Sequence, residues 1–154
     1  MRVPLIRAIQ NRTAVVAAAP SAVRGAGGRG VVHASRQFLA QLNLRAFSHT
    51  TERGFRRRLD IETENLRRAL PSQGRSWGGA RKVLNIFVLN AFYNHFLRTR
   101  YSLSKSAAWL EVPLDSLVAQ GLHAYPNGPV LPRWPGVKYL DPTISTPISG
   151  PRGA

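Results

Sequence analysis

The sequence ARKVLNIFVLNAFYNHFLRTR, residues 80–100, is the most strongly periodic segment of the chain. Its apolar residues recur three or four positions apart, so they form one wide face of a helix. Asparagines interrupt the remaining face, which argues against contact with lipid. The pattern predicts that residues 80–97 form the central and most buried helix of the protein. The side chains expected to be covered are Val83, Phe87, Ala91 and Phe96.

Shorter helical segments flank this stretch. Residues 60–70, DIETENLRRAL, place acidic residues early and basic residues late, as the helix dipole favours, and Pro71 ends the segment. Residues 71–79, PSQGRSWGG, are typical of a glycine-rich turn. Residues 115–123 are expected to form another short helix, while repeated prolines after residue 125 exclude regular helix. The predicted fold class is mainly α: a small helical domain with a hairpin between two helices and a Pro-rich, irregular C-terminal end.

The first 51 residues have a different composition from the rest. They contain arginine but no lysine and no acidic residue, and they are rich in alanine, valine and serine. This composition is typical of a mitochondrial transit peptide. The segment Arg45-Ala46-Phe47-Ser48 is similar to a mitochondrial processing site, with the cut after Phe47.

These features predict how the chain is organised. We expect residues 1–47 to be a disordered leader that directs import into the mitochondrial matrix and does not pack against the central helix. Residues 48–140 would form the helical domain, and residues 141–154 a flexible tail. The alternative for the first segment is a basic arm that binds nucleic acid.

Composition narrows the possible functions. The chain has 154 residues, with 22 Lys and Arg against 7 Asp and Glu, for a net charge of +15. Because there is no cysteine, disulfides, cysteine-bound metals and thiol nucleophiles are excluded. The four histidines are scattered, and no apolar run is long enough to span a membrane, so we expect no metal, no cofactor and no transmembrane segment. A charge this positive indicates a polyanionic partner.

Two segments resemble a known family. Residues 78–82, GGARK, follow a Leu-Pro pair and lead directly into an apolar helix with an early asparagine. Residues 112–119, VPLDSLVA, open a second helix with an Asp and a hydroxyl residue. Together they resemble the helix-hairpin-helix DNA glycosylases, both the endonuclease III-like members and the archaeal 8-oxoguanine glycosylases. The resemblance covers about residues 70–122.

The resemblance implies a DNA-repair glycosylase or abasic-site lyase that acts on damaged bases. Lys82 would be the nucleophile that attacks C1′ of the sugar and forms a Schiff base. Asp115 would assist that attack and stabilise the positive charge that develops on the sugar. Such chemistry requires the two side chains to face one sugar-sized space.

A basic surface is expected around this site. There is no acidic residue between Glu64 and Glu111, and a glycine-rich hairpin lets backbone N–H groups come close to a phosphate. DNA is favoured over RNA as the partner. The residues expected to contact nucleic acid are Arg75, Gly78, Gly79, Arg81, Arg98, Arg100 and Lys105.

Two other functions remain open. About 20 residues precede the turn after the leader, which is too few to build the pocket that encloses a flipped base. The chain would then be a degenerate relative, a noncatalytic mitochondrial nucleic-acid-binding protein. The third candidate is a small accessory subunit whose apolar helix docks on a protein or a membrane.

Overall fold

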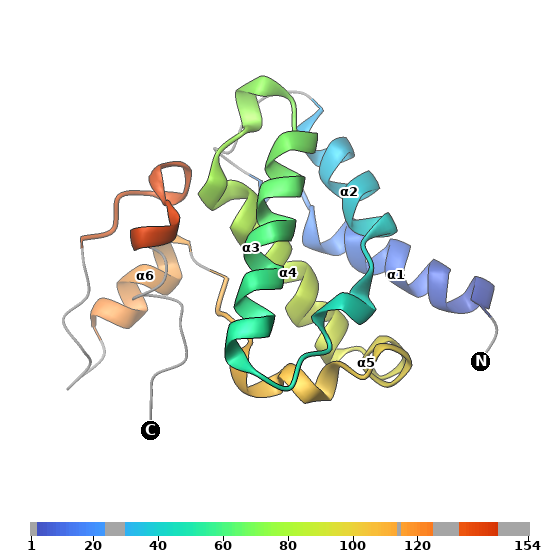
Figure 1. Ribbon diagram of the computed structural model, residues 1–154. Helices are drawn as coiled ribbons and strands as arrows, with labels where there is room; N and C mark the ends of the chain where they lie inside the picture. The colour runs from blue at the N-terminus through green and yellow to red at the C-terminus, as the bar shows by residue number, and fades with distance from the viewer. Residues whose placement is uncertain (1–2, 24–29, 114, 125–132, 145–154) are drawn as a thin grey trace.

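The computed structural model describes residues 3–23, 30–113, 115–124 and 133–144, and these residues contain helices but no strand (Figure 1). The predicted mainly α fold is confirmed. The α-helices are α1 (Val3–Ala17), α2 (Val31–Gln41), α3 (Glu52–Ala69), α4 (Trp77–Tyr93), α5 (His95–Tyr101) and α6 (Ser116–His123). The short 3₁₀ helices are η1 (Leu44–Phe47), η2 (Ser72–Gly74), η3 (Leu103–Trp109) and η4 (Val137–Tyr139).

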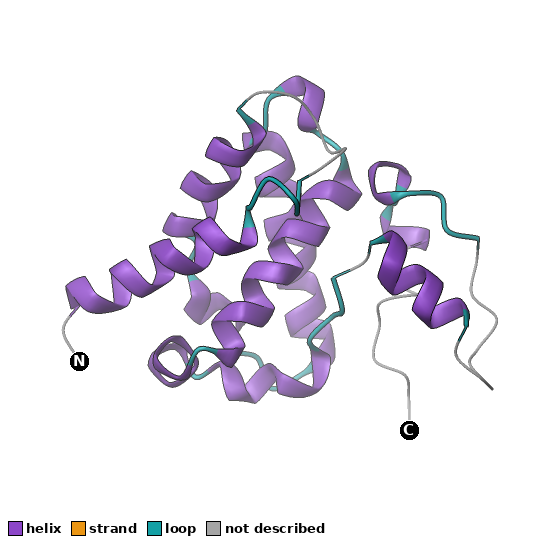
Figure 2. Ribbon diagram, turned by 180° about the vertical axis from the view of Figure 1, so that it is seen from behind, coloured by secondary structure: helices purple, strands orange, loops and turns teal. Residues whose placement is uncertain are grey.

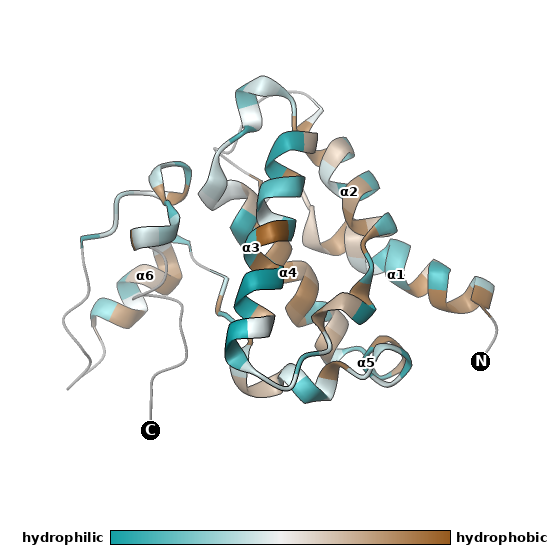
Figure 3. Cartoon of the chain, viewed as in Figure 1, coloured by the Kyte–Doolittle hydropathy of each residue, from teal (hydrophilic) through white to brown (hydrophobic). Residues whose placement is uncertain are grey.

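Helix α4 is the centre of the core. Helices α1, α2 and α3 all contact it, and its strongly apolar residues lie inside this group (Figure 3). Val83, Phe87 and Ala91 are buried, as their spacing predicts. Other helices of the same chain therefore cover the apolar face of α4. That face is not exposed for docking on another protein or on a membrane.

The predicted central helix is divided at Asn94. The side-chain Oδ1 of Asn94 accepts hydrogen bonds from the backbone N–H groups of Phe96 and Leu97, at 3.1 Å each, and so begins α5. Asparagine side chains compete with the backbone for these donors, which favours the start of a helix over its middle. Phe96 consequently turns outward and is 46% exposed, so the prediction that it is covered is wrong.

The N-terminal segment belongs to the core. Ile6, Ala14 and Ala17 of α1 are buried in the same cluster as the apolar residues of α4. The prediction that residues 1–50 do not pack against the central helix is wrong, because this segment has its own helical spacing of apolar residues. Residues 3–17 and 31–41 of the expected leader are helical.

A hydrogen-bonded joint holds α1 against α2. The side-chain amide of Gln10, buried on α1, donates to the backbone carbonyls of Leu39, Ala40 and Leu42 at 3.2, 3.3 and 2.8 Å. These carbonyls lie at the C-terminal end of α2, where helix carbonyls run out of partners within the helix; that of Leu39 also accepts from Leu42 N–H at 3.3 Å.

The C-terminal part forms a small second cluster beside the bundle, around α6 and η4 (Figure 2). Leu140 is buried there against Val118, Leu122 and Trp134. Helix α6 is the short helix that residues 115–123 predict, with Asp115 as its N-cap. Most of the predicted tail, residues 145–154, lies outside the described residues.

Candidate nucleic-acid interface

Internal ion pairs neutralise most of the acidic residues. All seven carboxylates of the chain lie among the described residues. Only Asp141 has no ion pair in this part of the chain; it accepts hydrogen bonds from Thr143 and Ile144, which lower its pKa. The others pair as Glu52 with Arg56, Asp60 with Arg81, Glu62 with Arg58, Glu64 with Arg67 and Arg68, Glu111 with Arg56 and Arg81, and Asp115 with Lys82.

The exposed group of Glu64, Arg67 and Arg68 illustrates this pairing. Arg67 donates two hydrogen bonds to the carboxylate at 2.7 and 2.8 Å, and Arg68 donates a third at 3.0 Å. The hydrogen bonds from Arg67, with smaller contributions from Arg68, lower the pKa of Glu64 to about 2. Glu64 therefore stays ionised at any physiological pH.

Many cations are left without a carboxylate. In residues 3–23, 30–113, 115–124 and 133–144, no salt bridge involves Arg7, Arg12, Arg36, Arg45, Arg53, Arg57, Arg75, Arg98, Arg100, Lys105, Arg133 or Lys138. Most of these side chains are exposed. The surface field is consequently positive wherever these groups gather.

One such gathering is the basic end of the bundle, which we define by Arg45, Arg53, Arg98, Arg100 and Lys105. These residues come from η1, the first turn of α3, α5 and η3, and these four segments lie at the same end of the molecule (Figures 1 and 2). Four of the side chains are exposed; the fifth, Arg98, lies with its guanidinium carbon 5.6 Å from the ring centre of Phe92. Three members, Arg98, Arg100 and Lys105, are among the residues that the sequence indicates.

The other predicted contact residues lie elsewhere. Arg75 is exposed at the opposite end of α4, where its Nε donates to the carbonyl of Leu70 at 2.9 Å. Because α4 separates Arg75 from the basic end, the predicted residues do not form one continuous stripe.

The two glycines belong to α4 and not to the preceding turn. Ser76 begins α4, and its Oγ accepts a hydrogen bond from Gly79 N–H at 3.2 Å. Gly78 and Gly79 are buried in the first turn of the helix. A Cβ on Gly78 would collide with the backbone oxygen of Val137. The close approach that glycine permits is thus used by η4 of the same chain, and Gly78 and Gly79 cannot cradle a phosphate in this conformation.

Arg81 is a core residue. Its guanidinium is buried and donates to both oxygens of Glu111, at 2.9 and 2.8 Å, and to Asp60 at 2.8 Å. The ring centre of Trp77 lies 5.2 Å from its Cζ. The prediction that Arg81 contacts nucleic acid is therefore wrong in this conformation, since none of its charge faces solvent freely.

Sequence analysis missed Glu111, the acceptor at the centre of this network. Its side chain is 1% exposed and also accepts from Asn85 at 3.2 Å and from Arg56 at 3.5 Å. One feature of the sequence could have identified Glu111: it lies within the apolar run Trp109-Leu110-Glu111-Val112. A carboxylate that is buried with such a run needs a cation beside it.

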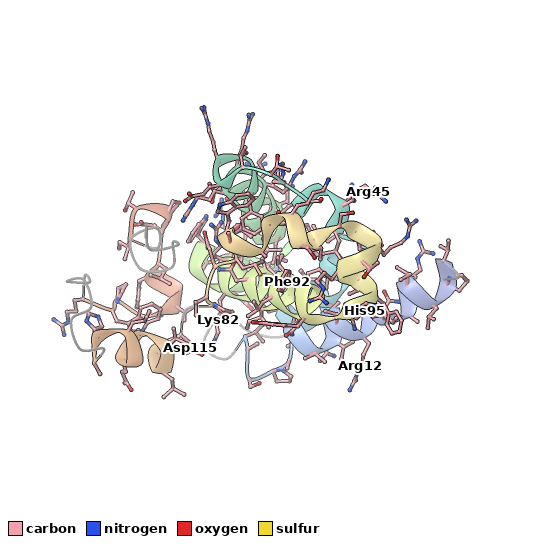
Figure 4. The ribbon with its side chains drawn as sticks, turned by 90° about the horizontal axis from the view of Figure 1, so that it is seen from below. Arg12, Arg45, Lys82, Phe92, His95 and Asp115 are labelled. Carbon is pink, nitrogen blue, oxygen red and sulfur yellow. The ribbon has the colours of Figure 1, made fainter. Side chains whose placement is uncertain are left out.

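Lys82 and Asp115 meet at the junction between α4 and α6 (Figure 4). Lys82 Nζ lies 3.7 Å from Asp115 Oδ2, and the side chains are 12% and 36% exposed. The other oxygen of Asp115 accepts a hydrogen bond from Val118 N–H at 3.0 Å and caps α6. The two residues that the resemblance pairs therefore lie within ion-pair distance of each other. This ion pair also connects the C-terminal cluster, through α6, to α4 of the helical bundle.

The described residues offer neither a metal site nor a membrane-spanning helix. They contain no group of three or more His, Asp or Glu that could hold a metal ion, and no helix among them is both long and apolar enough to cross a bilayer. Comparison of the chain with protein-family models, with curated proteins and with solved structures finds no match.

Proposed function

We propose that this protein binds nucleic acid, DNA in preference to RNA, through the basic end. One observation supports the proposal above all: the carboxylates from Glu52 to Asp115 are all engaged in internal ion pairs, while the cations of the basic end have no carboxylate partner among the described residues. The preference for DNA rests on the resemblance to DNA glycosylases.

The mode of binding follows from the residue types. Exposed arginine and lysine side chains contact phosphates and release counterions when they bind nucleic acid. Binding of this kind is largely independent of sequence and depends steeply on salt. We also propose that the protein acts in the mitochondrial matrix, on the basis of its acid-free, arginine-containing first 51 residues.

A double variant tests the basic end. Arg45→Gln with Lys105→Gln removes two exposed charges that make no salt bridge within the described residues. We expect the affinity for duplex DNA to fall, and the slope of log K against log salt to become shallower by about 0.9 for each phosphate that the variant no longer neutralises. Fluorescence anisotropy over a series of salt concentrations measures both quantities.

The control is Arg68→Gln at the far end of α3. Arg68 is exposed, but its charge is already paired with Glu64, so this variant should leave the slope unchanged. A slope that changes equally in the control and in a single basic-end variant would contradict a localised interface. A full chain that fails to bind DNA at low salt would overturn the proposal.

The second candidate function is abasic-site cleavage, and the observation that favours it is the 3.7 Å separation of Lys82 Nζ and Asp115 Oδ2. In this reaction the neutral amine of Lys82 condenses with the C1′ aldehyde of the open sugar and releases water, leaving an imine. Asp115 is placed to take the proton that Lys82 must lose before it attacks and to stabilise the resulting cation.

Borohydride trapping tests this candidate, since hydride reduces the imine to a stable amine that links protein and DNA. We expect the full chain to give a trapped product and Lys82→Gln to abolish it. Asp115→Asn should slow trapping without unfolding α6, because asparagine also caps helices well. Lys105→Gln serves as the control for removal of one positive charge. If Lys82→Gln and Lys105→Gln trap equally, the chemistry does not reside at Lys82 and the pair is purely structural.

A further inference from the structure

A cleft of about 860 Å³ opens between α1, the C-terminal end of α2 and α5. Helices α1 and α2 are consecutive in the chain, whereas α5 is distant in sequence, and both α2 and α5 contact α1 (Figure 1). The volume is within the range of small-molecule sites, about 300–1,000 Å³.

The charged groups of this cleft are two arginines. Arg7 comes from α1 and Arg100 from α5, and both are exposed and make no salt bridge with any described residue. No carboxylate lines the cleft. Guanidinium groups from two helices suit a phosphate, because each can donate two parallel hydrogen bonds to its oxygens.

Hydrogen bonds connect the three helices that line the cleft. Gln10 is one of the lining residues, and its amide N–H groups engage the last carbonyls of α2. Tyr101 of α5 donates its O–H to Gln10 Oε1 at 3.3 Å and so joins the third wall. The carbonyl end of a helix is partially negative, and these hydrogen bonds from Gln10 offset part of that charge at the edge of the cleft.

The remaining lining is suited to a base and a sugar. Exposed amides of Asn11, Gln37 and Gln41 face the cleft, beside the apolar side chains of Val3 and Ile6. Asparagine and glutamine amides can pair with the N6 and N7 atoms of adenine, as they do in DNA recognition.

We propose that this cleft binds an adenine nucleotide, with Arg7 and Arg100 on the phosphate and the amides on the base. This site shares Arg100 with the basic end, whose other members, Arg45, Arg53, Arg98 and Lys105, do not line the cleft. The nucleotide is either free or the phosphorylated end of a strand, and the same chemistry recognises both.

The experiment titrates the full chain with adenosine 5′-monophosphate by calorimetry. We expect binding that is weaker by about tenfold or more in Arg7→Gln and in Arg100→Gln, since each variant lacks one charged hydrogen-bonding group. Adenosine and inorganic phosphate should each bind more weakly than the nucleotide. Arg12→Gln, on α1 but outside the cleft, and Lys105→Gln, at the basic end, should leave nucleotide binding unchanged.

Two results would overturn the proposal: no binding of the nucleotide by the full chain, or an equal decrease of affinity in Arg7→Gln and Arg12→Gln. We expect Lys105→Gln to weaken duplex binding and to leave nucleotide binding unchanged. This difference distinguishes the two sites. Competition then identifies the source of the ligand. A 5′-phosphorylated oligodeoxyadenylate that displaces the nucleotide indicates a strand end, and one that does not indicates the free nucleotide.

Discussion

A protein that lacks residues 1–47 is expected to lose its cooperative folding transition. These residues supply α1, α2 and η1, and Leu39, Leu44 and Phe47 within them are completely buried. Each large apolar side chain contributes about 1.5–3 kcal/mol when fully buried. Because a domain is stable by only about 5–15 kcal/mol, the remaining chain cannot tolerate the removal of this whole layer over α4.

Thermal unfolding followed by circular dichroism, together with binding of a hydrophobic dye, measures this effect in residues 48–154. We expect a broad, shallow melt and strong dye binding, against a sharp melt and weak dye binding for the full chain. A control that removes only residues 145–154 should melt like the full chain. If residues 48–154 melt as sharply and at the same temperature as the full chain, α1 and α2 are dispensable for folding.

This result bears directly on the proposed processing site. Phe47 is buried and packs edge-on against Phe55 with ring centres 6.1 Å apart, and its carbonyl accepts a hydrogen bond from Ser106 Oγ at 2.6 Å. A protease can reach the bond after Phe47 only in the unfolded chain. Sequencing of the cellular protein should therefore begin near Ser48 only if the cut precedes folding. Recovery of an intact Met1 from mitochondria would favour an uncleaved N-terminal segment.

Glu111→Gln is expected to cost about 3–5 kcal/mol of unfolding free energy, the range found when one partner of a buried ion pair is removed. The substitution keeps the size of the side chain but takes the negative charge away from the buried guanidinium of Arg81, which then keeps Asp60 as its only carboxylate. Asp60 is largely exposed and cannot offset the burial of that charge alone.

Urea unfolding of three variants tests this explanation. Glu52→Gln breaks an exposed pair with Arg56 and should cost no more than about 1 kcal/mol. Replacing Arg81 and Glu111 together by Met and Leu should cost less than Glu111→Gln alone, because no buried charge is left without a partner. If the double variant costs as much as Glu111→Gln or more, the network is not an electrostatic unit.

The local features of this protein can be predicted from short segments of its sequence. The spacing of Val83, Phe87 and Ala91 identified the buried face of α4, because a helix repeats every 3.6 residues whatever surrounds it. The start of α6 could be predicted from Asp115 for the same local reason, since a cap needs only the backbone that follows it. The break at Asn94 had an equally local signal, which the continuous apolar pattern across it obscured.

Which segments meet depends on packing between helices that are distant in the sequence, and no local pattern predicts it. Composition assigned residues 1–47 to a leader, but burial depends on the shape of the neighbouring helices, and these place α1 and α2 over α4. Likewise, nothing near Arg81 in the sequence distinguishes it from an exposed arginine. It is buried because Glu111, 30 positions away, brings a carboxylate to it across the core. The number of charged residues gives the net charge of the chain. The fold determines which cations are paired with carboxylates and which stay available to a ligand. Each ion pair depends on the distance between two charged groups, and no local sequence pattern predicts that distance.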